Sequence, residues 1–555
     1  MTRRLLAVAS MTLIAASFSS VVASAQPLAF SAQKLPNTAS RTEPRMAIDA
    51  VGRRFLITNQ LNPSRRQAVV FGSVDGGASW TLTHNPEEPA ISSTDVDIVA
   101  TRTGRLIAIL LDYAPAITFH IFYSDDQGAS WHPTLLNPGI ADSDRPWLAV
   151  GPDDPSTHLP RVYLLYHNLA SGTVTHNMFV STSSDNGASF GPPVGVTSPP
   201  SQEWQDLQCA DSGGPSSIAV SQQTGRIYVA WGSRTSDAAG GCGASVTPGP
   251  FEVNVVAATR VWVATSPDNA PGSWSASLAV DDSQSNKIVS YQLSPAALDS
   301  AGNVYVAYDE STHAYPNYDG ASLKYRWSDP ELRTWHGPVQ VEPAGDPGNV
   351  LPHIIAGAPG KIDIAYQHGE TLAGHDNPVW YTRVAQVLNA LDASPTPTIV
   401  RVSDVPAFDQ TASILMGACT EGPLPGVTNN TCGRSTDVWA IALDANCMLT
   451  ISWSSEATDP SRAPGADPGT YVARQTGGDP LGPAGTCNQF APATNAAVTP
   501  SSASSTAAPA ATPFSAGGTR SPAVALLLVL LGLAAAAGAA AIRVSGAPSP
   551  ARRRR

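Results

Sequence analysis

An internal repeat in the middle of the chain constrains the fold most. Each copy has a proline, an apolar run, a turn with glycine, and a second apolar run ending in an aromatic residue; the clearest are Pro215–Trp231, Pro295–Tyr308 and Pro352–Tyr366. Weaker copies start at Pro44, Thr94 and Pro146, and a last one runs from Asp437 to Trp453. Such short alternating runs are typical of antiparallel strands joined by tight turns. Copies about fifty residues or more apart fit four-stranded blades around an axis, so the sequence predicts an all-β propeller.

The number of copies and the ends of this region predict how the ring closes. Seven copies indicate seven blades, with six as the alternative. The last copy, Asp437–Gly477, lacks a fourth strand, and Pro27–Pro36 has the pattern of one. Closing the ring with strands from both ends would remove the exposed sheet edges. We therefore expect the propeller to span residues 26–487.

A second motif follows the strand pair in several copies. It reads Ser-x-Asp-x-Gly-Ala-Ser and then an aromatic residue, and its three near-intact copies contain Ser73, Asp75, Gly77 and Trp80; Ser124, Asp126, Gly128 and Trp131; and Ser183, Asp185, Gly187 and Phe190. Degraded forms occur at Ser266–Trp274 and Ser328–Trp335. Asp and Ser side chains bond backbone amides, glycine permits a positive φ, and the ring packs into the blade. The motif therefore predicts a structural turn.

This spacing resembles the Asp-box, or BNR repeat, of the sialidase-like propellers of exported bacterial proteins. The resemblance covers about residues 40 to 475. In that family the box lies on the far side from the substrate pocket, which implies a structural role for its Asp residues. Six blades are usual in sialidases, which is why six remains the alternative to seven.

The N-terminus predicts export. Arg3 and Arg4 precede an apolar stretch that ends at Ala23-Ser24-Ala25, a pattern that a signal peptidase accepts. Residues 1–25 are therefore predicted to be a removed signal peptide. An N-terminal membrane anchor is the alternative, but the segment is short and contains several Ser residues.

The C-terminus predicts a membrane anchor. Ala523–Ile542 has no charged residue and is long enough to cross a bilayer as a transmembrane helix. Arginines follow at Arg543 and from Arg552 to Arg555, which predicts a cytoplasmic tail over 543–555 and an extracellular propeller. A removed GPI-type tail is the alternative, but such tails end in apolar residues. Residues 488–522 are rich in Ala, Thr, Pro and Ser, the composition of a stalk.

Six cysteines agree with an exported protein, because export permits disulfides. Their local spacing suggests three pairs: Cys209 with Cys242, Cys419 with Cys432, and Cys447 with Cys487. A zinc site is the alternative, but the chain has no C-x-x-C pair. The histidines show no ligand spacing either, so we expect no metal and no cofactor.

The charge balance limits the partners. The net charge is −12, and an acidic surface repels polyanions, which argues against nucleic-acid binding. We expect a monomer whose partner is a glycan or an extracellular protein.

Loops that lead into the innermost strands, and loops between second and third strands, form the ligand face of a propeller. The repeats place arginines there, and guanidinium groups could hold the carboxylate of an acidic sugar. The candidate binding residues are Arg41, Arg45, Arg145, Arg434 and His353.

The resemblance also implies a catalytic set. Sialidases use an arginine triad, an Asp acid/base, and a Tyr nucleophile activated by Glu. The matching positions are Asp95 or Asp97 for the acid/base and Tyr291 with Glu310 for the nucleophile pair. The family's first arginine stands in Arg-Ile-Pro, whereas this chain reads Arg41-Thr-Glu-Pro.

Two classes of function follow from the sequence. A sialidase-type glycoside hydrolase needs three convergent arginines and a buried Tyr/Glu pair. A non-catalytic module that binds a glycan or a protein needs only a polar concave face. The fold alone does not choose between them.

Overall fold

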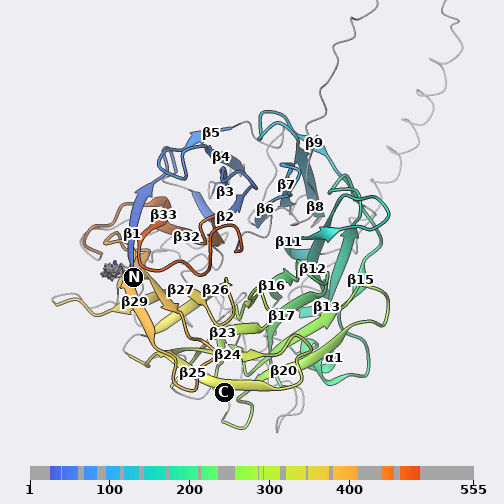
Figure 1. The fold of residues 1–555 in the computed structure, drawn as a ribbon. Helices are drawn as coiled ribbons and strands as arrows, with labels where there is room; N and C mark the ends of the chain where they lie inside the picture. Colours follow the sequence, from blue (N-terminus) through green and yellow to red (C-terminus); the bar gives the residue numbers. More distant parts are fainter. Residues whose placement is uncertain are drawn as a thin grey trace, which may run out of the picture. The chain divides into compact units, whose positions relative to one another are not determined.

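The computed structural model describes residues 26–487, except 39–40, 61–67, 84–94, 113–117, 137–142, 171–173, 210–213, 236–256, 286, 292, 313–320, 346–347, 374–378, 410–438, 456–459 and 461–462. The described strands form seven four-stranded antiparallel blades, arranged around a centre in Figure 1. The predicted all-β propeller with seven blades is confirmed, and the six-blade alternative is excluded.

Each blade is one sheet, and in blades 1 to 6 the strands run in chain order from the centre outwards. Blade 1 contains β2 (Arg41–Ile48), β3 (Arg54–Gln60), β4 (Val69–Ser73) and β5 (Thr81–Leu82). Blade 2 contains β6 (Val96–Ala100), β7 (Leu106–Asp112), β8 (Thr118–Ser124) and β9 (His132–Pro133). Blade 3 contains β11 (Ser143–Asp153), β12 (Pro160–Ala170), β13 (Val174–Ser183) and β15 (Val194–Gly195). Blade 4 contains β16 (Pro215–Val220), β17 (Ile227–Ser233), β19 (Arg260–Ser266) and β20 (Ser275–Asp281).

The remaining blades follow the same plan, and short elements lie between them. Blade 5 contains β22 (Ala296–Leu298), β23 (Val304–Glu310), β24 (Ser322–Ser328) and β25 (Trp335–Glu342). Blade 6 contains β26 (Asn349–Ala356), β27 (Ile362–Glu370), β28 (Val379–Val387) and β29 (Pro397–Arg401), and β30 (Phe408–Asp409) also pairs with β28. Blade 7 contains β31 (Ala440–Leu443), β32 (Leu449–Ser455), β33 (Gly469–Gly477) and β1 (Ala29–Lys34). The short elements are β10 (Leu135–Leu136), β14 (Ser189–Phe190), β18 (Ala257–Ala258), β21 (Ser290–Tyr291) and α1 (Gln202–Leu207).

The ring is closed by the two ends of the propeller chain. Innermost strands contact one another from β2 through β6, β11, β16, β22 and β26 to β31, which contacts β2 again. The outer strand of blade 7 is β1, which pairs antiparallel with β33 from Ala29 to Lys34. The predicted use of the N-terminal segment as the missing fourth strand is confirmed.

Two faces of the ring follow from this topology. We call the upper face the side on which the chain reaches each innermost strand and passes from the second strand to the third. The lower face carries the turns from first to second strand and from third to fourth.

Apolar packing between blades explains the continuous hydrophobic runs. In β12, Val162 and Leu164 pack into the core shared with blade 2, whereas Tyr163 and Leu165 pack into the core shared with blade 4. Both faces of a second strand are therefore buried, as is typical of strands covered on two sides.

The Ser-x-Asp turns form on the lower face with the predicted hydrogen bonds. In blade 1, the Ser73 hydroxyl accepts from the Gly77 amide at 2.8 Å, and Asp75 accepts from the Ser79 amide at 2.9 Å. Asp75 accepts hydrogen bonds from the Ser79 hydroxyl, the Ser79 amide and the Ser73 hydroxyl, which hold the pKa of Asp75 well below its usual range. The bonds repeat around Asp126 and Asp185. The turns are structural, as predicted.

In blade 3 this turn also contacts the preceding blade. Gly187 has φ +79°, and a Cβ atom built on it would lie 2.3 Å from Ile107 Cδ1 of blade 2. The Gly187 carbonyl accepts from the hydroxyl of Thr134, which follows blade 2, at 3.0 Å. Glycine is therefore needed here for both the backbone conformation and the close approach.

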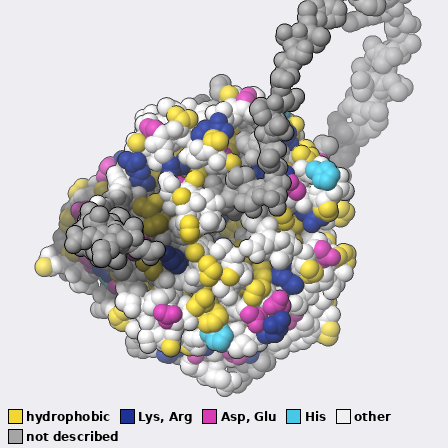
Figure 2. Space-filling model, in the orientation of Figure 1, with side chains coloured by type: hydrophobic (Ala, Val, Ile, Leu, Met, Phe, Trp, Pro, Cys, Tyr) yellow, Lys and Arg dark blue, Asp and Glu magenta, His cyan; other side chains and the backbone are white. Residues whose placement is uncertain are grey.

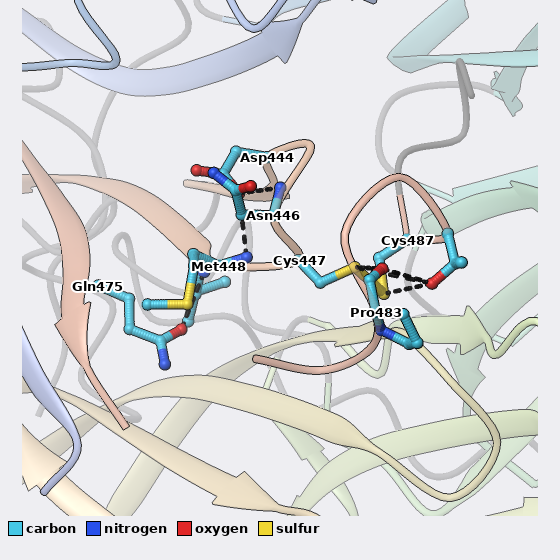
Figure 3. The surroundings of a disulfide bond; sticks show 9 residues. Asp444, Asn446, Cys447, Met448, Gln475, Pro483 and Cys487 are labelled. Carbon is cyan, nitrogen blue, oxygen red and sulfur yellow. Dashed lines mark hydrogen bonds between the residues drawn. A yellow bond between two sulfur atoms is a disulfide. The ribbon is translucent and has the colours of Figure 1, made fainter. Parts of the chain in front are cut away.

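A disulfide fixes the end of the propeller on the lower face (Figure 3). Cys447 is bonded to Cys487, as predicted. Cys447 has φ +60° in the turn between β31 and β32, where the equivalent turn of blade 1 has Gly52 with φ +85°. The Asp444 carboxylate holds the turn by accepting from the amides of Asn446 and Met448.

The other predicted features are only partly within the described residues. Cys209 is disulfide-bonded, whereas its predicted partner Cys242 and both Cys419 and Cys432 lie outside those residues. So do the signal peptide, the stalk, the anchor Ala523–Ile542 and the tail. Within residues 26–487, no helix is long and apolar enough to cross a membrane.

Candidate functional site

Three innermost strands share a strained bulge at the upper face. Glu43, Arg145 and Leu351 have φ values of 52°, 50° and 55°, and each precedes a proline. The register of β2, β11 and β26 shifts by one residue there. A positive φ is uncommon outside glycine, and proline disfavours the helical region in the residue before it. Backbone strain of this kind clusters at functional sites.

After the bulge, the residue that follows the proline pairs with the second strand of its blade. In blades 1, 3 and 6 that residue is Arg45, Trp147 and His353. The three positions are equivalent in the repeat, and the fold brings the Arg45 cation to the Trp147 ring and near His353.

Arg45 is held from three sides. Its Nε donates to Asp97 Oδ1 at 3.0 Å, and its Nη1 donates to the Trp439 carbonyl at 3.2 Å. Its Cζ lies 4.8 Å from the centre of the Trp147 ring, a cation–π contact. Nη2 has no hydrogen-bond partner among the described residues, and 23% of the side chain is exposed. One edge of the guanidinium is therefore available to a ligand.

Asp97 holds the Arg45 side chain in place through a hydrogen bond. The carboxylate is buried, and it also accepts from the Ile98 amide at 2.9 Å and from the Leu148 amide of blade 3 at 2.8 Å. Both oxygens are used, Oδ1 by Arg45 and Ile98 and Oδ2 by Leu148. The carboxylate therefore connects blades 1, 2 and 3 and holds Arg45 in position.

His353 is a neutral neighbour of the arginine. Its ring lies 4.8 Å from the Trp439 ring, and the side chain is buried. Burial, reinforced by the charge of Arg45, lowers the pKa of His353 to about 3. The imidazole is therefore uncharged at any physiological pH.

A second group of polar residues lies at the bulge of blade 3. His167 Nε2 is 3.6 Å from Asp144 Oδ2. Burial opposes the charge on Asp144, but His167 and Arg145 outweigh it and hold the pKa of Asp144 below its usual range. A Cβ atom at Gly214 would lie 2.7 Å from both Arg145 Cδ and His167 Nε2, so glycine is needed for this approach.

The other predicted site residues are not brought to Arg45 by any described contact. Arg434 lies outside the described residues, and the side chains of Arg41 and Tyr291 are outside them too. Asp95 precedes β6, and its carbonyl accepts from the Leu111 amide. Glu310 ends β23, and its carboxylate lies 2.6 Å from Lys324 Nζ and 3.8 Å from Lys287 Nζ.

A buried Tyr/Glu pair does exist, but it lies between blades 5 and 6. Tyr366 donates to Glu342, and Arg383 lies 2.6 Å from the same carboxylate. Burial, and then the charge of Glu342, raises the pKa of Tyr366. The ring packs in the core of these two blades, so this pair is structural.

Sequence reasoning missed Trp147 and Trp439 as site residues, because both read as core aromatics of the repeat. The signal that could have found Trp147 is its place directly after Pro146, which matches Arg45 after Pro44 and His353 after Pro352.

The charged side chains on the visible surface of the described residues are not gathered into one large patch of either sign. On the face seen in Figure 2, positive and negative side chains are scattered in small groups, without a broad basic patch. Among the described residues, no cluster of His, Cys, Asp and Glu could hold a metal ion. The site offers one guanidinium edge in an acidic protein, which suits a single anionic group on an otherwise neutral ligand.

Comparison with known proteins gives structural neighbours only. No protein-family model and no curated protein matches the chain. A polysaccharide lyase of family PL25, an ulvan lyase, is 10% identical with a TM-score of 0.48, covering 81% of this chain and 97% of its own. A GH93 α-L-arabinofuranosidase of Fusarium graminearum is 9% identical, covers 82% and 97%, and has a TM-score of 0.39. The NanB sialidase of Streptococcus pneumoniae is 10% identical, covers 80% and 70%, and has a TM-score of 0.37.

Proposed function

We propose that this protein is an exported, membrane-anchored propeller that binds a carboxylate-bearing glycan on its upper face. The observation that carries the proposal is the arrangement of Arg45, which Asp97, Trp439 and Trp147 hold in place while Nη2 keeps no partner in the described chain. A guanidinium fixed in advance binds a carboxylate with two parallel hydrogen bonds at little entropic cost. That this carboxylate belongs to a glycan follows from the resemblance of the repeats to sialidase-like propellers.

Binding, rather than hydrolysis, is the function that the described contacts favour. Asp97 accepts three hydrogen bonds, and Glu310 is paired with Lys324. A general acid must carry a proton that it can give to the leaving group, and a nucleophilic tyrosine needs a base beside it. Neither carboxylate is arranged for those roles.

The test measures binding of 3′-sialyllactose, a glucuronic acid disaccharide and lactose to the full-length protein by calorimetry. We expect binding of an acidic sugar and none of lactose. Arg45→Gln should weaken that binding by roughly 10- to 100-fold, the value of a charge-assisted hydrogen bond.

Arg401→Gln is the matched control for this variant. Arg401 is also partly exposed, pairs with Glu370 and lies 4.0 Å over the Tyr381 ring, but it belongs to the outer strand of blade 6. Its loss should leave affinity unchanged. Equal affinity of wild type and Arg45→Gln would refute the proposal, and release of free sugar during the titration would show a hydrolase instead.

Export and anchoring are tested by cell fractionation. The full chain should be recovered in the membrane, and a chain ending at Pro522 should be released into the medium. A chain ending at Pro522 that stays in the membrane would assign the anchor to the N-terminal segment.

A further inference from the structure

Asn59 is a buried amide at the upper end of blade 1. It is the last residue but one of β3, and only 1% of its surface is exposed. Neither Oδ1 nor Nδ2 has a hydrogen-bond partner among the residues that the structure describes, and no other side chain of that set has two buried polar atoms without one. Native proteins rarely keep such a group without a reason, because its loss of hydration is not repaid.

The same position in the other bulged blades has a polar side-chain partner, an ion-pair contact in blade 3 and a hydrogen bond in blade 6. Asn59 pairs across the sheet with Thr42, as His167 pairs with Asp144 and Gln367 with Val350. His167 lies 3.6 Å from the Asp144 carboxylate, and Gln367 Nε2 donates to the Thr382 hydroxyl at 3.2 Å.

Blade 1 lacks the partner that blade 6 supplies. The register of β3 with β4 pairs Thr58 with Val69, and its continuation sets Asn59 opposite Ala68, where blade 6 has Thr382 opposite Gln367. The repeat therefore offers Asn59 no hydroxyl on its third strand. Among the three equivalent side chains Asn59, His167 and Gln367, only Asn59 has no polar partner in the described part of the chain.

Asn59 lies on the side of blade 1 that carries Arg45. Arg45 pairs directly with Ile57, and side chains alternate along a strand, so Arg45, Ile57 and Asn59 share one face. That face is turned toward blade 2, because Ile57 packs with Val96 and Ile98 and Arg45 reaches Asp97. Asn59 is two residues beyond Ile57, about 7 Å along the strand and toward the upper rim.

We infer that Asn59 is a specificity residue that hydrogen-bonds a neutral polar group, a hydroxyl or an amide, of the ligand whose carboxylate Arg45 holds. This inference rests on the proposed function. A side-chain amide offers a donor and an acceptor together, which matches a sugar hydroxyl or an N-acyl group. A site that buries such an amide discriminates against ligands that lack the matching group, because the amide would then stay unpaired.

The test uses Asn59→Leu, a replacement of similar shape, in the full-length protein. Affinity for 3′-sialyllactose and the midpoint of urea unfolding are both measured. We expect affinity to fall roughly three- to tenfold, the value of one neutral hydrogen bond, while the unfolding midpoint rises because a buried amide is removed.

The matched control is Gln367→Leu, at the equivalent position of blade 6. It should lower the unfolding midpoint, because it leaves Thr382 without its partner, and it should leave affinity unchanged.

Two outcomes would overturn the inference. Unchanged affinity with a raised midpoint would make Asn59 an unsatisfied group with no ligand. A lowered midpoint would show that the amide has a protein partner.

Failure of the proposed function gives a different result: 3′-sialyllactose does not bind at all, or Arg45→Gln does not change its affinity. A loss in Arg45→Gln with none in Asn59→Leu removes this inference alone. Asn59→Ala repeats the measurement if the leucine variant does not fold.

Discussion

Asp363 allows a sharp test of how burial controls stability in this ring. The side chain lies in β27 and is fully buried. Its Oδ1 accepts from Gln386 Nε2 at 3.2 Å, and its Oδ2 has no partner. No ion pair of the described residues includes it, so no cation offsets its charge. Burial therefore raises the pKa of Asp363 to about 7.

The sign of the effect follows from the direction of this shift. The folded protein holds the proton up to about pH 7, whereas the unfolded chain releases it near pH 4. The contribution of protonated Asp363 to the free energy of unfolding is complete below the pKa of this group in the unfolded chain, and it is lost as the pH rises through 7. At about 1.4 kcal/mol per pH unit, the interval from pH 5 to pH 7 corresponds to about 3 kcal/mol.

The perturbation is Asp363→Asn, which is neutral at every pH. The assay is urea unfolding of wild type and variant at pH 5 and pH 8.5. Other titrating groups cancel in the comparison, so the stability of the variant relative to wild type should increase by about 3 kcal/mol between these two pH values. Asp479→Asn is the control, since Asp479 is exposed and contacts the same Gln386 through its carbonyl. A stability difference that is the same at both pH values would refute the reasoning.

The remaining predictions concern turns and cross-links. Asp185→Ala removes the acceptor of three hydrogen bonds in its turn and should lower stability by about 1–3 kcal/mol without changing ligand affinity, as measured by urea unfolding and calorimetry. Gly187→Ala places a Cβ atom against Ile107 at φ +79° and should cost about 1–3 kcal/mol, whereas Gly272→Ala, with a similar φ and open space, should cost less. Replacing Cys447 and Cys487 by serine opens a loop of 40 residues and should cost up to about 4 kcal/mol, and peptide mapping without reduction should link these two cysteines in the wild type.

Local patterns predicted much of the fold. The hairpin repeats and the Ser-x-Asp turns are encoded within a few residues, so Pro215–Trp231 and the turn around Asp75 could be read directly. Closure of blade 7 by Pro27–Pro36 could be predicted because the last repeat lacks a fourth strand and this segment has the pattern of one.

The site was harder to predict because its geometry depends on a departure from local preference. A positive φ at Glu43, directly before Pro44, runs against what both residues favour, so sequence reasoning treats the extra residue in Arg41-Thr-Glu-Pro as a broken motif. In the structure the extra residue forms a bulge, after which Arg45 pairs with Ile57 and reaches Asp97. The contact of Arg45 with Trp439 joins the first and last blades, and no spacing rule predicts such a pair.

The pairing of β1 with β33 sets an order for assembly of the ring. The N-terminal strand leaves the ribosome first, but its partner is among the last segments to be made, so β1 must wait for almost the whole propeller. Contacts between residues this distant in sequence form slowly, because the chain must lose the entropy of closing a long loop before these contacts stabilise it. Until then β33 is an open edge to which a strand of another chain could add. The seven-bladed ring therefore closes last at the pairing of β1 with β33, and we expect slow docking of β1 to favour aggregation over closure of the ring.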